Sequence, residues 1–327
     1  MPMGRLAQVL RDTKVTADPR LLVGPDTFDD AGIVSIGVPG APLLVQTADF
    51  FPPVVDHPYW YGAIAAANSL SDVYAMGGRP LSAITLAGFP KDFDEEWIAE
   101  IMRGGFEKIR EAGAVVAGGH TVESELQFGF AVTGLVDEDQ VTANTGAKVG
   151  DLLYLTKRLG MGTMTTASKR GLVDWATMEG AARQMAHLNA KGAEAMVAAG
   201  CRAATDVTGF GLMGHARNVA DGSKGTLRFV ASDLPLWEGA RDLAAQGVCS
   251  GGSKRNRSAL ESVVRIGGGV DPAVATCVFD AETSGGLLIV IARDRADRLE
   301  QELAARGEPV HRVGEVVAPD GVFVELV

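Results

Sequence analysis

The sequence predicts an α/β protein of two domains, and three observations lead to this expectation. Short apolar runs typical of strands alternate along the chain with longer stretches typical of helices. The chain has 327 residues, roughly twice the length of a domain of about 150 residues. A polar, glycine-bearing stretch lies at residues 145–150. We place the boundary there, which predicts domains at residues 1–147 and 148–327, called here the N-terminal and C-terminal halves.

The N-terminal half is expected to alternate strands with two helices. The first helix, at residues 59–76, is followed by Gly77 and Gly78, a common C-terminal stop. The second, at residues 95–112, has acids in its first turn and basic residues later, as the helix dipole favours. The expected strands lie at residues 33–38, 43–47, 81–86, 115–117 and 128–135.

The C-terminal half opens with an expected strand at residues 152–156 and alternates in the same way. Further strands are expected directly before Asp206 and at residues 226–230, 286–291, 313–317 and 322–327. Helices are expected at residues 161–169, 178–199, 209–220 and 295–306. The two halves share this rhythm, which is compatible with two related domains.

Composition narrows the classes of function. The net charge is −11, so the chain lacks the basic footprint of a nucleic-acid-binding protein. The 46% of hydrophobic residues supply a core. The 41 glycines, against a usual level of roughly 7%, gather in short groups, which indicates tight turns and close backbone approach to a ligand. An anionic substrate would need its charge offset, and metal ions are the obvious agents.

The cysteines and the apolar runs indicate the cellular compartment in which the protein is expected. Cys201, Cys249 and Cys277 form no CxxC pair and are odd in number, which argues against a disulfide framework or a zinc site. A reducing cytoplasm is therefore expected. No apolar run approaches the roughly 20 residues of a membrane span. Residues 1–11 carry two arginines and no long apolar core, so they do not read as a signal peptide.

Acids lie beside two expected strands of the N-terminal half. Asp29 and Asp30 follow Thr27 and Phe28 just before a strand, where paired carboxylates bind a hard cation such as Mg²⁺ or simply face solvent in a turn. Asp49 lies at the end of the strand at residues 43–47, where the loops of α/β proteins form ligand crevices. A plain turn residue is the alternative for Asp49.

The helix at residues 59–76 carries a polar pair on a largely apolar surface. Asn68 and Asp72 are four residues apart and share one face. Burying such a pair without partners costs free energy. Either this face of the helix is exposed to solvent, or it binds a ligand or a metal ion. The adjacent alanines at residues 65–67 indicate close packing and favour the second reading.

Glycine-rich segments that can approach phosphates occur in both halves. Gly118, Gly119 and His120 follow an apolar strand, where backbone N–H groups can reach an anion. Asp206 precedes the segment TGFGLMGH at residues 208–215, whose threonine can cap a helix and whose glycines let an anion rest on the helix N-terminus. Tight turns and a structural histidine are the alternatives.

Two more segments are candidates for ligand contacts, with flexible surface loops as the alternative: a basic glycine loop at residues 251–256 and the acidic segment at residues 280–286.

The chain has no GxxxxGK[ST], no GxSxG and no kinase signature. Nucleotide phosphates would therefore be held by Mg²⁺ bridged to aspartates, with backbone amides helping. This arrangement is chemically sound because phosphoryl transfer depends mostly on positioning and charge neutralisation.

Six stretches together resemble the selenophosphate synthetase (selenide, water dikinase) family. They run in the family's order from about Asp18 to the C-terminus, and six long stretches in order are highly specific. They read LLVGPDTFDDAG, TADFFPPVVDHPYWYGAIAAANSLSDVYAMGGRP, AGGHTVE, TDVTGFGLMGHA, GGSKRN and DAETSGGLL.

The resemblance implies the fold of aminoimidazole ribonucleotide synthetase (PurM-like), with two α/β domains and a homodimer built from the N-terminal halves. It implies that ATP, selenide and water give selenophosphate, AMP and phosphate. It implies Mg²⁺ ligands at Asp30, Asp72 and Asp206. It also implies nucleotide contacts, of which the last three reach across the dimer interface: Thr27, Phe28, Asp29, Asp49, Asn68, Asp72, Gly118, Gly119 and His120.

The sequence departs from the family at its start. Family members carry a glycine-rich segment with a reactive Cys and Lys before the first helix, and here Met1-Pro2-Met3 aligns after that segment. None of the three cysteines substitutes by position, so no catalytic residue is assigned. We expect a truncated or mis-called start, with a natural loss of the segment as the alternative, since the metal-site acids are intact. The alternatives are a non-catalytic nucleotide-binding homodimer and another ATP-dependent kinase or ligase of the same superfamily.

Overall fold

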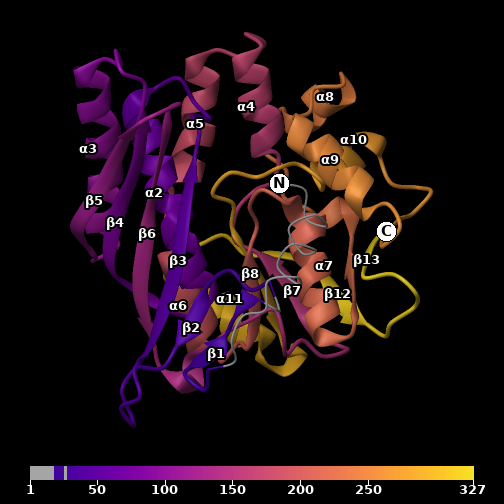
Figure 1. Cartoon of the computed structure of the whole chain (residues 1–327). Coiled ribbons are helices and arrows are strands. Elements are labelled where there is room, and N and C mark those ends of the chain that lie inside the picture. Colours follow the sequence, from indigo (N-terminus) through magenta and orange to yellow (C-terminus); the bar gives the residue numbers. More distant parts are fainter. Residues whose placement is uncertain (1–17, 26–27) are drawn as a thin grey trace.

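The computed structural model describes residues 18–25 and 28–327, and it confirms an α/β architecture built on two sheets (Figure 1). The first sheet has six strands in the order β1-β2-β3-β6-β4-β5. Its neighbours are antiparallel except β4 and β5, which run parallel. Its strands are β1 Leu21–Val23, β2 Gly32–Val34, β3 Leu43–Phe51, β4 Arg79–Phe89, β5 Val115–Glu123 and β6 Gln127–Val136.

One face of the first sheet is covered by helix α2 (Pro58–Ala75), against which helix α3 (Glu95–Glu111) packs. The two helices approach so closely that a Cβ atom on Gly104 would lie 2.0 Å from the carbonyl oxygen of Tyr59. A Cβ atom on Gly62 would lie 1.8 Å from the carbonyl oxygen of Ile101. Glycine at these two positions therefore sets the distance between α2 and α3.

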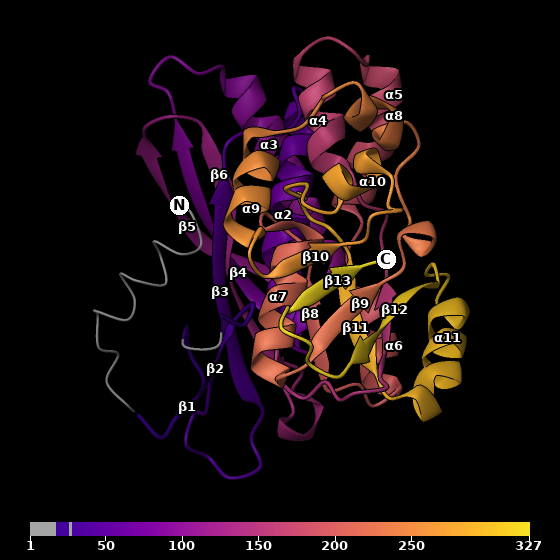
Figure 2. The same ribbon diagram turned by 90° about the vertical axis from the view of Figure 1, so that its right-hand side faces the viewer.

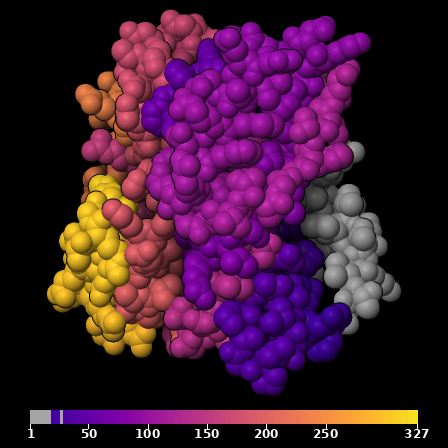
Figure 3. All heavy atoms as spheres, turned by 90° about the vertical axis from the view of Figure 1, so that its left-hand side faces the viewer, coloured from indigo at the N-terminus to yellow at the C-terminus, as the bar shows by residue number. Residues whose placement is uncertain are grey.

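The opposite face of the first sheet, called here the open face, is not covered by any helix of residues 18–25 and 28–327. Phe50 on β3 and Ile84 on β4 point away from α2 and are 54% and 47% exposed. The edge strand β5 is exposed along most of its length. Figure 3 looks onto the side of the molecule where the N-terminal half lies.

The second sheet has seven strands in the order β10-β13-β9-β12-β7-β11-β8 and stands beside the first (Figure 2). The pairs β10–β13 and β13–β9 are parallel, and the others are antiparallel. Its strands are β7 Leu152–Leu155, β8 Ala203–Asp206, β9 Thr226–Phe229, β10 Val264–Ile266, β11 Leu287–Ile291, β12 His311–Val317 and β13 Val324–Leu326.

Helices cover both faces of the second sheet, so its central strands are buried on both sides. Leu153 and Leu155 of β7 join one core with α7 (Gly211–Ser223). Leu152 and Tyr154 join the other core, which continues into α2 and the first sheet. The remaining helices of this half are α4 Met161–Lys169, α5 Trp175–Ala186, α6 Ala190–Ala198, α8 Ala240–Ala245, α9 Gly251–Leu260, α10 Pro272–Cys277 and α11 Ala296–Ala305.

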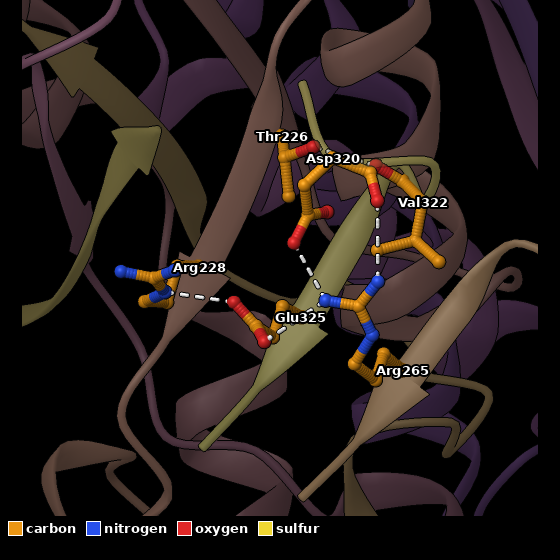
Figure 4. Close-up of polar contacts among 6 residues, drawn as sticks. All are labelled: Thr226, Arg228, Arg265, Asp320, Val322 and Glu325. Carbon is orange, nitrogen blue, oxygen red and sulfur yellow. Dashed lines mark hydrogen bonds and ion pairs between the residues drawn. The ribbon is translucent and has the colours of Figure 1, made fainter. Parts of the chain in front are cut away.

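The outer strands of the second sheet are joined by ion pairs (Figure 4). Glu325 on β13 accepts from Arg228 on β9 at 2.8 Å and from Arg265 on β10 at 3.3 Å. Arg265 also pairs with Asp320 at 2.6 Å. Because the arginines are more than a third exposed, these pairs fix the alignment of strands more than they add stability.

Several expected boundaries are wrong for physical reasons. The helix expected at residues 178–199 is two helices, because the chain turns at Asn189, whose side chain donates to the Ser71 hydroxyl and the Gly285 carbonyl. The basic glycine loop at residues 251–256 is the start of α9, capped by the Ser250 hydroxyl. Strand β5 runs on through Gly118, Gly119 and His120 because it pairs with β4 up to Phe89. The domain boundary at residues 147/148 stays a prediction.

Candidate active site between the two halves

Four aspartates from both halves converge where α2 meets the second sheet. Asp49 comes from β3, Asp72 from α2 and Asp206 from the end of β8, while Asp30 lies two residues before β2. Asp72 and Asp206 are 8% and 1% exposed. Burial raises the pKa of Asp72 well above its usual range, and the charges of Asp49, Asp206 and Asp30 raise it further. The predicted metal-site acids therefore share one buried, electronegative location.

The polar face of α2 makes this convergence possible. The helix is buried from Tyr61 to Ala75, so its polar side chains need partners. Asp72 accepts a hydrogen bond from the Thr47 hydroxyl. Asn68 donates to the Asp49 carboxylate at 2.8 Å and accepts from the backbone N–H of Ser284 at 3.0 Å. The solvent-facing alternative for Asn68 and Asp72 is wrong, because this face meets the C-terminal half.

Asp30 and Asp206 offer oxygens suited to a hard cation. Asp30, Asp206 and His215 each place one potential ligand atom within 4.8 Å of the others. Oδ2 of Asp30 and Oδ2 of Asp206 are buried and have no hydrogen-bond partner in the described part of the chain. Burial raises the pKa of Asp206 to about 6. Buried carboxylate oxygens without a donor are what Mg²⁺ would use, so the residues present fit the ion.

The residues before Asp30 are held by Asn144, near the end of the N-terminal half. Phe28 has a positive φ of 52°, and its carbonyl accepts from the Asn144 side chain at 2.7 Å. Asp29 accepts from the Asn144 backbone N–H at 2.6 Å. Thr27 lies outside the described residues. Asn144 thus fixes the turn that delivers Asp30.

Gly118, Gly119 and His120 lie elsewhere in the chain's own structure. Strand β5 is separated from β3 by β6 and β4, so it stands about 14 Å from β3 at the usual strand spacing. His120 is aligned with Leu86 and Gly129, and the latter with Phe50, on the open face away from α2. One chain does not bring these three residues to the aspartates.

A buried lysine completes the site and was missed by the sequence analysis. Lys157 lies two residues after the end of β7, is 4% exposed, and donates to the Ser284 carbonyl at 2.8 Å. Burial lowers the pKa of its ammonium to about 7, against the opposing effect of the Asp206 carboxylate. A lysine at the end of a fully apolar strand is the sequence signal that would have identified it.

The loop at residues 280–286 is largely buried and is hydrogen-bonded to both halves of the chain. The alternative that it is a flexible surface loop is therefore wrong. Glu282 accepts from the backbone N–H groups of Gly160 and Met161, at 2.6 and 3.0 Å, and caps the start of α4. Burial raises the pKa of Glu282 to about 8. Ser284 has a positive φ of 50°, and its hydroxyl is buried without a partner in the described structure. Its backbone links Asn68 to Lys157.

Comparisons with known proteins agree with this architecture. Residues 28–136 match the family model "AIR synthase related protein, N-terminal domain", and residues 148–327 match the C-terminal domain of the same family. A solved structure of AaThiL complexed with AMPPCP and TMP superposes with a TM-score of 0.71 at 19% identity, over 99% of this chain and 93% of that chain. The protein belongs to the AIR synthase related family and has its two-domain fold.

Relatives with higher sequence identity identify a more specific family for the chain. The chain is 45% identical to the selenide, water dikinase of Geobacter metallireducens, over 92% of this chain and 88% of the relative. It is 44% identical to the selenide, water dikinase of Nitratidesulfovibrio vulgaris strain DP4, over 95% and 88%. The chain belongs to the selenide, water dikinase family.

Proposed function

We propose that this protein catalyses the ATP-dependent synthesis of selenophosphate from selenide, with release of AMP and phosphate. The names of relatives that are 45% and 44% identical over most of both chains support this function. The observation that carries it is the convergence of Asp30, Asp72 and Asp206 from both halves. Asp30 and Asp206 each have a buried carboxylate oxygen without a donor among the described residues.

We propose Mg²⁺ at Asp30, Asp72 and Asp206. When bound, the ion neutralises the charge of the phosphates. Asn68 and Asp49 are hydrogen-bonded to each other beside this site, and in our proposal both contact the nucleotide. The other proposed nucleotide contacts are Phe28, Asp29, Asp72 and Thr27, the last of which lies outside the described residues. The complex of AaThiL with AMPPCP, an ATP analogue, supports a nucleotide site in this fold.

We further propose a homodimer. The open face of the first sheet exposes apolar side chains such as Phe50, Ile84 and Val122, and contiguous exposed apolar surface is typical of an interface. Pairing of two copies through this face would carry Gly118, Gly119 and His120 of one copy toward the other copy's nucleotide. The need for a second copy explains why these residues lie far from the aspartates of their own chain.

We propose a cytoplasmic location, which the three free cysteines suit. Within the described part of the chain, no helix combines the length and apolar character that a bilayer crossing requires. The partners we propose are ATP and selenide. The net charge of −11 disfavours a nucleic-acid partner.

The decisive experiment identifies the products. Purified protein receives ATP, Mg²⁺ and selenide, and ³¹P NMR with nucleotide chromatography follows selenophosphate and AMP. The same assay is run on a form extended at its N-terminus by a glycine-rich Cys/Lys segment. AMP and selenophosphate support the proposal. ADP as the nucleotide product, or ATP binding without turnover in both forms, contradicts it.

A matched pair of variants tests the metal site within the same assay. Asp206→Asn keeps the shape of the side chain and removes a buried carboxylate from the proposed site. Asp294→Asn makes the same change at an exposed position before α11. We expect turnover to fall at least about 10-fold in the first variant only. Wild-type turnover of Asp206→Asn would remove this residue from the metal site.

A further inference from the structure

A line of hydrogen bonds runs from the start of α7 to the carboxylate of Asp30. His215, a buried residue of α7, has its Nδ1 atom 3.3 Å from the Thr205 hydroxyl. The Thr205 hydroxyl in turn donates to Oδ1 of Asp30 at 2.8 Å. The other carboxylate oxygen of Asp30, Oδ2, is the buried one without a partner in the described structure. The line therefore occupies one oxygen of Asp30 and leaves the other open.

The contacts of His215 fix which ring nitrogen carries the proton. The backbone N–H of Thr208 points at Nε2 from 3.2 Å, and a backbone N–H can only donate. Nε2 must therefore accept, and in the neutral ring Nδ1 bears the hydrogen. Nδ1 then donates to Thr205, and the single hydroxyl hydrogen of Thr205 has two acceptors in reach, Oδ1 of Asp30 at 2.8 Å and the Asp206 carbonyl at 3.1 Å. The Asp30 oxygen is nearer and belongs to a carboxylate, so we assign the hydrogen to Asp30. Burial keeps the ring neutral, since it lowers the pKa of His215 to about 4.

We propose that His215 is a positioning residue for the metal site: it orients the Thr205 hydroxyl, which holds Asp30 with Oδ2 turned to the cation. This inference rests on the proposed Mg²⁺ site. It assigns a role to the histidine of the TGFGLMGH segment, which contributes no proposed ligand. Partners that orient a ligating side chain commonly change metal affinity by about 10- to 100-fold when removed.

Direct ligation by His215 is the competing reading, because a ring nitrogen lies within 4.8 Å of the Asp30 and Asp206 oxygens. Both ring nitrogens already have partners in the described structure, Thr208 at Nε2 and Thr205 at Nδ1. A metal bond would have to displace one of these contacts. A hard cation such as Mg²⁺ also prefers oxygen to imidazole nitrogen. The geometry favours the positioning role.

The test measures Mn²⁺ affinity by EPR on the full chain without nucleotide, so that it does not depend on turnover. His215→Leu removes both ring contacts, and Thr205→Val removes the hydroxyl while keeping the shape. We expect each variant to weaken Mn²⁺ binding about 10-fold. We expect the double variant to be no weaker than either single one, because the two residues act in one line. His215→Asn places an amide donor near the Nδ1 position and should restore most of the affinity.

The controls separate this inference from the metal site itself. His311→Leu removes a half-buried histidine of β12 and should leave Mn²⁺ affinity unchanged. Wild-type affinity in both His215→Leu and Thr205→Val, or additive losses in the double variant, would overturn the positioning role. Coupling of bound Mn²⁺ to a ¹⁴N nucleus in the wild type would also overturn it, by making His215 a ligand.

If His215→Leu does not fold, the affinities of Thr205→Val and His215→Asn still decide between the two roles. If the wild type itself binds no Mn²⁺, the metal site falls and this inference falls with it.

Discussion

The side chain of Asn68 accepts a hydrogen bond from the backbone N–H of Ser284 at 3.0 Å, which joins helix α2 to the loop before β11. The same side chain donates to Asp49 at 2.8 Å. One buried amide therefore ties an acid of the site in the N-terminal half to the 280–286 loop of the C-terminal half.

Replacing this amide should destabilise the protein. Asn68→Leu leaves the Ser284 N–H and one Asp49 oxygen without a partner in a buried location. Each such group costs about 1–3 kcal/mol, so the free energy of unfolding should fall by about 2–5 kcal/mol. Urea denaturation measures this change. A loss below about 0.5 kcal/mol would show that the amide does not join the halves.

Lys157 should make stability depend on pH in the alkaline range. The pKa of its ammonium is about 7 in the folded protein, against 10.5 for a lysine side chain in water. Between these values the unfolded chain holds the proton and the folded chain does not. Stability from this group is therefore present above pH 10.5 and is lost as pH falls through 7, by at most about 1.4 kcal/mol per pH unit.

Comparison of two lysines checks this expectation. In Lys157→Met the group is absent, so the unfolding free energy of the wild type should rise relative to the variant between about pH 7 and 9.5. The rise should reach a few kcal/mol in urea titrations with EDTA. Lys148→Met, at an exposed lysine before β7, should give a curve parallel to the wild type. A parallel curve for Lys157→Met as well would mean that the buried lysine keeps its proton.

Gly104 should tolerate no side chain. Alanine normally favours a helix over glycine by about 1 kcal/mol. Here the added Cβ atom would meet the Tyr59 carbonyl at 2.0 Å, so α2 and α3 must move apart. We expect Gly104→Ala to lower the thermal midpoint by several degrees, since overpacking costs about 1–3 kcal/mol. Gly251→Ala in α9, where the nearest atom is the mobile end of Arg255, should leave the midpoint nearly unchanged.

The open face of the first sheet should control assembly. Ile84→Glu places a charge in the centre of the proposed dimer interface, where an unpaired buried charge is costly. We expect a monomer in analytical ultracentrifugation, together with weaker ATP binding because the partner's contacts are lost. Leu172→Glu, at a 55% exposed leucine after α4, should sediment like the wild type. A dimer in the Ile84→Glu variant would place the interface elsewhere.

The sequence predicted the acids of the site better than their surroundings. Asp49, Asp72 and Asp206 lie beside recognisable apolar strands or on an apolar helix, so local patterns identify them. Lys157 also follows a recognisable apolar strand, but its burial beside Ser284 depends on the pairing of β7 with β11, which the sequence does not show. The break between α5 and α6 was likewise not predicted from the sequence, because it depends on tertiary contacts. Asn189 lies at this break and donates hydrogen bonds to Ser71 and Gly285, which are distant in sequence.

Helix α2 carries a consequence for biosynthesis. One side of it packs on the first sheet, but α5 and β8 cover another, and β8 ends at Asp206. A nascent chain that has emerged from the ribosome only as far as β6 has no structure with which to cover that side. That side of a mostly apolar helix stays uncovered until some 70 further residues, from the end of β6 to the end of β8, are made. At the usual 5–20 residues per second this takes several seconds. During synthesis this apolar surface is therefore a site that a chaperone would cover.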